Sequence, residues 1–86
     1  MMKRISPHLI YRSYVITRSY AGVVFRHPYT VPRRYSWGLE DRLIGCLLEV
    51  SAESYTTPTQ ARRRLYQVAQ RLQDRRDQRR ELGGEE

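Results

Sequence analysis

The sequence predicts a small all-α protein, an antiparallel bundle of three helices in a single domain that spans residues 1–86. Two observations support this fold class. Helix start signals stand at Ser6-Pro7 and Thr57-Pro58, because Ser and Thr cap helices well and Pro is tolerated at the first helical position. Apolar residues also recur at helical spacing in the second half of the chain. A chain of 86 residues fits one domain with a modest core.

The first helix is expected at about residues 7–26, from the signal at Ser6-Pro7 to the stop at Pro28. The many Val, Ile and Tyr residues of this segment favour strands instead, which leaves a β-hairpin turning near Ala21-Gly22 as the alternative. Periodicity does not separate the two, because the apolar residues fit a helical and an alternating pattern. The alternative fold is therefore an N-terminal β-hairpin followed by two helices.

Residues 27–35 are expected to form a basic loop, punctuated by Pro28 and Pro32. A second helix is expected at about residues 37–54, with Ser36 as its N-cap. Its apolar stripe follows the spacing i, i+4, i+7, i+8 and i+11. The stripe consists of Leu39, Leu43, Cys46, Leu47 and Val50.

The third helix is expected at about residues 58–82, where Ala61, Leu65, Val68 and Leu72 form a second stripe. Because the joint between the second and third helices is short, the two should pack antiparallel. Their shared core is expected to contain Leu43, Leu47, Val50, Leu65, Val68 and Leu72.

The charge is positive and unevenly distributed. The formal net charge is +7, fifteen of the sixteen basic residues are Arg, and the first acidic residue is Glu40. The Arg guanidinium is planar, always charged and forks onto phosphate oxygens, so this composition favours a phosphate-bearing partner over a merely solvated surface. The sequence therefore predicts a partner that bears phosphates, such as nucleic acid, with a carboxylate-bearing protein as the alternative.

No constellation of residues indicates catalysis. His8 and His27 are isolated, and no Cys or carboxylate stands at metal-ligand spacing from them. No Gly-rich phosphate loop is present, and Cys46 is the single cysteine, so no internal disulfide can form. We expect no enzyme activity, no catalytic residue, no metal and no cofactor. No apolar run approaches the length of a membrane span, so we also expect a cytoplasmic protein without a membrane partner.

The candidate binding residues are basic or aromatic. Three consecutive Arg residues open the third helix at positions 62–64, where the helix dipole disfavours positive charge and a phosphate would offset it. Tyr35 is the preferred residue for stacking on a base. The full candidate set is Arg12, Arg18, Arg33, Arg34, Tyr35, Arg62, Arg63, Arg64, Arg71 and Arg75.

The run from Val31 to Gly38, and above all Arg34-Tyr35-Ser36-Trp37-Gly38 before a Leu-rich segment, resembles the four-helix-bundle superfamily. Its members include ribosomal-RNA intervening-sequence proteins and the accessory variability determinants of diversity-generating retroelements. The resemblance implies an all-α bundle, a ring of identical subunits and a basic surface that serves a reverse transcriptase and its template RNA. The chain is shorter than these members, so it has no sequence for a fourth helix.

Together these observations predict a nucleic-acid-binding accessory subunit, with RNA favoured over DNA, a reverse transcriptase as a possible protein partner and a homo-oligomeric state. The alternative is a small protein–protein adaptor or enzyme inhibitor that binds an acidic protein partner.

Overall fold

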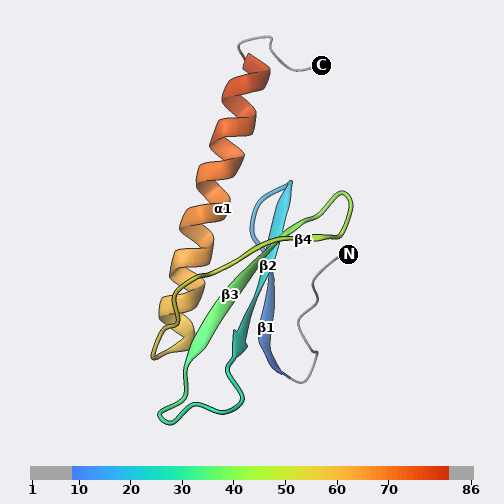
Figure 1. Cartoon of the computed structure of the whole chain (residues 1–86). Coiled ribbons are helices and arrows are strands. Elements are labelled where there is room, and N and C mark those ends of the chain that lie inside the picture. The colour runs from blue at the N-terminus through green and yellow to red at the C-terminus, as the bar shows by residue number, and fades with distance from the viewer. Residues whose placement is uncertain (1–8, 82–86) are drawn as a thin grey trace.

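The computed structural model describes residues 9–81 and consists of a four-stranded antiparallel sheet with one helix on one face (Figure 1). Each strand pairs with the next along the chain, in the order β1-β2-β3-β4. The elements are β1 (Ile10–Val15), β2 (Tyr20–Arg26), β3 (Tyr35–Asp41), β4 (Leu47–Val50) and α1 (Pro58–Glu81).

The predicted all-α bundle is therefore wrong. The segment expected as the first helix, residues 7–26, forms the β1–β2 hairpin over its described part, because its β-branched and aromatic residues alternate between the two faces of a strand. The alternative fold included a hairpin here, with its turn near Ala21-Gly22. The connection between the two strands lies instead at residues 16–19, and Ala21 and Gly22 belong to β2, where they pair with β1. The described residues contain one helix, α1, so the other helix of that alternative, expected at residues 37–54, is wrong.

The second predicted helix, residues 37–54, is replaced by most of β3, a turn and β4. The turn has its own local determinants. The Asp41 carboxylate accepts hydrogen bonds from the amides of Leu43 and Ile44 at 2.8 and 3.3 Å, and Gly45 adopts a positive φ of 70°. These features fix a reversal of the chain in the middle of the apolar stripe, so the helical spacing of that stripe does not correspond to a helix.

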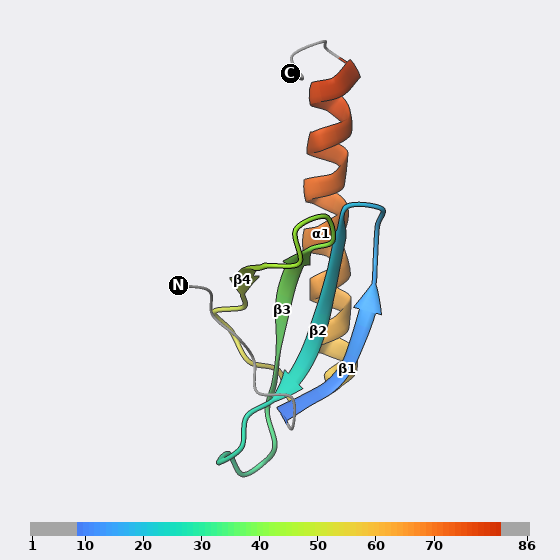
Figure 2. The ribbon, with the colours of Figure 1, turned by 90° about the vertical axis from the view of Figure 1, so that its right-hand side faces the viewer.

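The third predicted helix corresponds to α1, whose expected last residue, Leu82, lies outside the described residues. Thr57 caps it, since its Oγ1 accepts a hydrogen bond from the Gln60 amide at 3.2 Å. The core lies between α1 and the strands β2 and β3 (Figure 2). It contains Tyr20, Val24, Trp37, Leu39, Ala61, Leu65 and Ala69.

The predicted shared core is half wrong. Leu65 is fully buried, and Val68 and Leu72 pack against the core. By contrast, Leu43 is 73% exposed and Val50 is 37% exposed. The partner of the α1 stripe is thus the alternating side chains of β2 and β3, and not a second helix.

Gly22 of β2 lets the helix approach the sheet closely. A Cβ atom at this position would lie 2.7 Å from the Gly38 carbonyl oxygen and 2.8 Å from both methyl carbons of Leu65. These distances are too short for any side chain, so the Leu65 side chain fills the space that the glycine leaves open.

A polar clamp fastens the second half of α1 to the β1–β2 connection; we use this term for Arg18, Ser19, Gln73 and Asp77. The Ser19 amide donates to Gln73 Oε1 at 3.2 Å, Gln73 Nε2 donates to Asp77 Oδ1 at 3.2 Å, and Arg18 forms an ion pair with Asp77. Beside the clamp, the guanidinium of Arg76 lies 5.6 Å from the centre of the Tyr20 ring. The end of α1 extends beyond the sheet (Figure 1).

Candidate nucleic-acid interface

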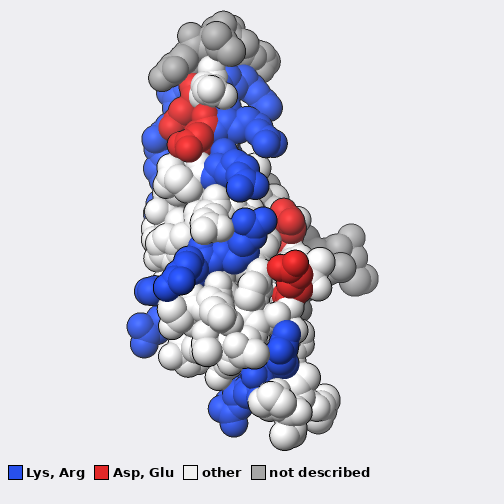
Figure 3. Space-filling model, turned by 90° about the vertical axis from the view of Figure 1, so that its left-hand side faces the viewer, with Lys and Arg blue, Asp and Glu red and all other residues white. Residues whose placement is uncertain are grey.

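The outer face of α1 is strongly basic. The helix contains eight Arg against three acidic residues, a net charge of +5, and no acidic residue lies in its first turn. Lys and Arg side chains follow the length of this face in Figure 3, with acidic side chains at its upper end and at one side. Arg62, Arg63 and Arg64 are all exposed, so the predicted cluster is accessible to a ligand.

Three hollows surround the first two turns of α1, and neighbouring hollows share lining residues. The first, of about 150 Å³, lies between β1 and α1 and includes Tyr11, Arg12 and Arg62. The second, of about 410 Å³, is lined by Arg62, Arg63, Tyr66 and Gln67.

The third hollow, also of about 410 Å³, shares Arg63 and Gln67 with the second and extends to Arg34, Tyr55 and Arg64. Among the described residues, no Asp or Glu lines any of the three. We call the Arg and Tyr residues of these hollows the Arg–Tyr band. It consists of Arg12, Arg34, Arg62, Arg63, Arg64, Tyr11, Tyr14, Tyr55 and Tyr66.

The aromatic rings of the band are restrained by their neighbours. Tyr14 and Tyr66 meet edge to face with ring centres 5.9 Å apart, and the Arg62 guanidinium lies 5.9 Å from the centre of the Tyr14 ring. Tyr11 meets Tyr35 edge to face, also at 5.9 Å. Such contacts hold rings and cation in defined positions relative to one another.

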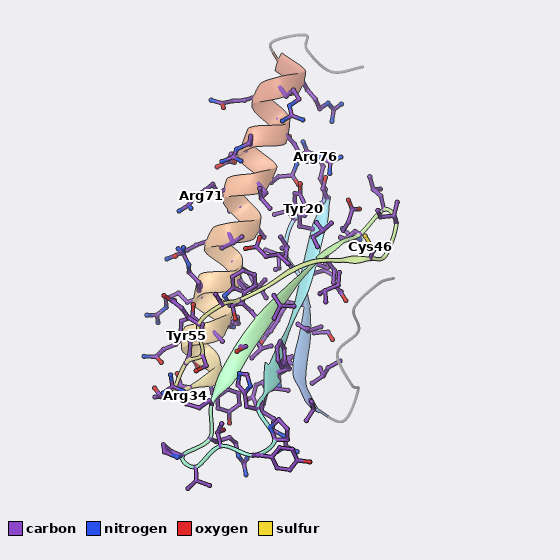
Figure 4. All side chains as sticks on the ribbon, viewed as in Figure 1. Tyr20, Arg34, Cys46, Tyr55, Arg71 and Arg76 are labelled. Carbon is purple, nitrogen blue, oxygen red and sulfur yellow. The ribbon has the colours of Figure 1, made fainter. Side chains whose placement is uncertain are left out.

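Arg34 is held by the segment that precedes α1. Its Nε donates to Ser54 Oγ at 2.9 Å, and one terminal nitrogen donates to the Ser54 carbonyl oxygen at 2.8 Å. Arg34 lies close to Tyr55 at the lower end of α1 (Figure 4). Because these two bonds fix the plane of the guanidinium, Arg34 is pre-oriented at the edge of the third hollow.

The structure separates the other predicted site residues from the band. Arg18 belongs to the polar clamp, and Arg33 is exposed in the β2–β3 loop. Arg71 and Arg75 are exposed further along α1, where Arg71 projects away from the sheet in Figure 4. Tyr35 is half-buried and exchanges backbone hydrogen bonds with Tyr55 at 2.7 and 2.8 Å, which makes it a structural residue more than a stacking platform.

None of the four tyrosines of the band, Tyr11, Tyr14, Tyr55 and Tyr66, was among the sequence-based candidates. For Tyr66 a signal exists in the sequence, because it stands four residues after Arg62 and so shares its helix face. For Tyr11 and Tyr55 no local signal exists, since their nearness to α1 depends on how the sheet and the segment before α1 pack.

His27 Nε2 and Ser36 Oγ lie 2.7 Å apart, and Ser36 is 2% exposed. Residues 9–81 hold no group of three or more His, Cys, Asp or Glu side chains that could bind a metal ion. Cys46, the single cysteine of the chain, is half-buried.

In the part of the chain that the structure describes, no helix has the length and apolar character needed to cross a membrane. No family model, no curated protein and no solved structure matches this chain.

Proposed function

We propose that the protein is a nucleic-acid-binding subunit that contacts phosphates through the Arg–Tyr band. The observation that carries this proposal is the continuity of the three hollows, which bring five Arg and four Tyr residues together with no acidic residue in their lining. Arg forms charge-assisted, bidentate hydrogen bonds with phosphate oxygens. A surface that carries only positive charge also attracts a polyanion at long range.

The position of the band at the start of α1 adds to this attraction. The first amides of a helix lack partners inside the helix, and the helix dipole places partial positive charge there. Arg62, Arg63 and Arg64 follow in the second turn of α1 and add three positive charges close to this end of the helix, which favours an anionic ligand there.

RNA as the preferred nucleic acid stays a prediction. The reverse transcriptase partner and the ring of subunits were implied by the four-helix-bundle resemblance, and the all-α fold that this resemblance also implies is contradicted by the sheet. The proposal therefore rests on the band alone.

The test is the salt dependence of binding to mixed-sequence RNA and DNA. Each phosphate contact contributes a slope of about −0.7 for single strands and about −0.9 for duplex in a plot of log affinity against log salt. Arg62 and Arg63 join neighbouring hollows, so the double variant Arg62→Gln/Arg63→Gln should reduce the slope by about 1.4 to 1.8.

The matched control is Arg79→Gln/Arg80→Gln, which removes the same charge from exposed positions at the far end of α1. It should change the slope much less. Equal effects of the two double variants would place the contact outside the band, and a wild-type chain without measurable affinity at low salt would disprove the proposal.

A second candidate function, protein–protein adaptor, is favoured by the β3–β4 turn. Leu43 and Ile44 are 73% and 71% exposed at its tip, where the amides of both residues donate hydrogen bonds to the Asp41 carboxylate. Exposed neighbouring aliphatic side chains on a fixed turn are a feature of protein-binding surfaces. Leu43→Ser/Ile44→Ser should abolish partner capture if this function holds, and should leave nucleic-acid binding unchanged.

A further inference from the structure

We infer that the ligand of the Arg–Tyr band is a single-stranded nucleic acid, with Tyr11 and Tyr66 stacking on two of its bases and Arg62 contacting the backbone between them. This inference rests on the proposed function and specifies the class of nucleic acid.

The first argument is the exposure of the two rings. Tyr11 is 52% exposed and Tyr66 is 39% exposed, and each belongs to one of the hollows that Arg62 also lines. Each ring is restrained by an edge contact, Tyr11 by Tyr35 and Tyr66 by Tyr14. A restrained ring loses less conformational entropy when a base stacks on it. In a duplex the bases are already stacked on each other, so exposed rings would contribute little.

The second argument is the order of side chains along the band. Arg62 lines both the first hollow, which includes Tyr11 of β1, and the second hollow, which includes Tyr66 of α1. Its guanidinium also lies 5.9 Å from the centre of the Tyr14 ring. Two aromatic rings and one guanidinium along the band correspond to two bases and the phosphate that joins them in an extended single strand.

The third argument is the curvature of the path. The band passes from β1 across the convex outer surface of α1 to the segment that precedes the helix. Duplex DNA is stiff over roughly 50 nm and would touch only one part of such a path, whereas a flexible single strand can follow all of it.

The experiment compares a short mixed-sequence RNA single strand with the RNA duplex of equal length. Tyr66→Leu should weaken single-strand binding by roughly 5- to 100-fold, the loss expected when one base–aromatic stack is removed. Tyr66→Phe keeps the ring and should bind as the wild type does. Tyr29→Leu is the control, because Tyr29 is 96% exposed and lines none of the three hollows.

Cross-linking tests the same inference without a mutation. A single strand that carries 5-iodouracil should give a photo-adduct at Tyr66 or Tyr11, because the stacked base lies against the ring. Adducts at other tyrosines only would overturn the inference.

The outcomes separate this inference from the proposed function. Binding to duplex that equals or exceeds binding to single strand, with no effect of Tyr66→Leu, overturns the single-strand inference and leaves nucleic-acid binding intact. The absence of binding to both forms at low salt overturns both.

Discussion

Gly22 shows how a single residue sets the distance between the helix and the sheet. Gly22→Ala places a methyl group against the Gly38 carbonyl oxygen and both methyl carbons of Leu65. We expect it to lower the free energy of unfolding by about 1–3 kcal/mol, as overpacking does. Leu65→Ala alone should cost about 2–5 kcal/mol, because Leu65 is fully buried. In the Leu65→Ala background Gly22→Ala should cost less, since two of its three close contacts are gone.

Urea denaturation of the four proteins in this cycle measures the coupling. Gly45→Ala is the matched control. It meets no atom within 4 Å but occupies a φ of 70°, so its strain of about 1–2 kcal/mol should be the same in both backgrounds. Full additivity of Gly22→Ala and Leu65→Ala would show that the helix does not seat on the sheet as described.

At the scale of elements, the polar clamp determines how far along its length α1 stays attached. Gln73 is 4% exposed and bridges the Ser19 amide and Asp77. Gln73→Leu should reduce hydrogen-exchange protection in the second half of α1 by about 1 kcal/mol, the usual net contribution of such hydrogen bonds. The loss of protection should stay near this value because the Ser19 amide also donates a hydrogen bond to Thr17 Oγ1, at 3.3 Å, and so keeps one acceptor in the variant.

Gln70→Leu is the control for this prediction. Gln70 is exposed and bonds only within α1, to Asp74 at 3.1 Å among the contacts described. Its replacement should leave hydrogen-exchange protection in the second half of α1 much less changed than Gln73→Leu does. If the two variants behaved alike, the clamp would have no role in docking the helix.

The elements also show which parts of the fold the sequence could reveal. The helix α1 was predictable, because its start signal at Thr57-Pro58 and its apolar stripe point to the same structure. The strand β3 was not, because Leu39 and Leu43 share a helical spacing by chance while Trp37 and Leu39 share the alternating one. Only the turn chemistry at Asp41 and Gly45 decides between the two, and both residues are also compatible with a helix end.

The same limit applies to the candidate site. The exposure of Arg62, Arg63 and Arg64 agrees with their charge, which makes burial costly. Arg18 could not be separated from them by sequence, because its partner, Asp77, lies far away along the chain. Tertiary packing thus divides the Arg residues into structural and accessible ones.

At the scale of the whole molecule, one core joins β2, β3 and α1, so the chain should unfold in a single cooperative step. Trp37, the only Trp, is 4% exposed at the centre of this core. Its fluorescence and the far-ultraviolet circular dichroism should therefore give the same midpoint in urea. Two separate midpoints would show that α1 detaches before the sheet unfolds.

The molecule is elongated, with extents of 49 × 26 × 19 Å, because α1 is longer than the sheet is tall. A core of this size gives a modest stability, and self-association, which would add to it, stays a prediction. Sedimentation equilibrium of the chain without nucleic acid would measure the subunit number directly.

The strand order β1-β2-β3-β4 has a consequence for synthesis of the chain. Each strand can pair as soon as its neighbour has left the ribosome, so the sheet needs only short loops to close. Its apolar face stays uncovered until α1, the last described element, has been made. During that interval the nascent chain is exposed to aggregation. The helix that ends this exposure also carries eight Arg residues against three acidic residues, so the step that covers the apolar face also increases the positive charge that keeps nascent chains apart.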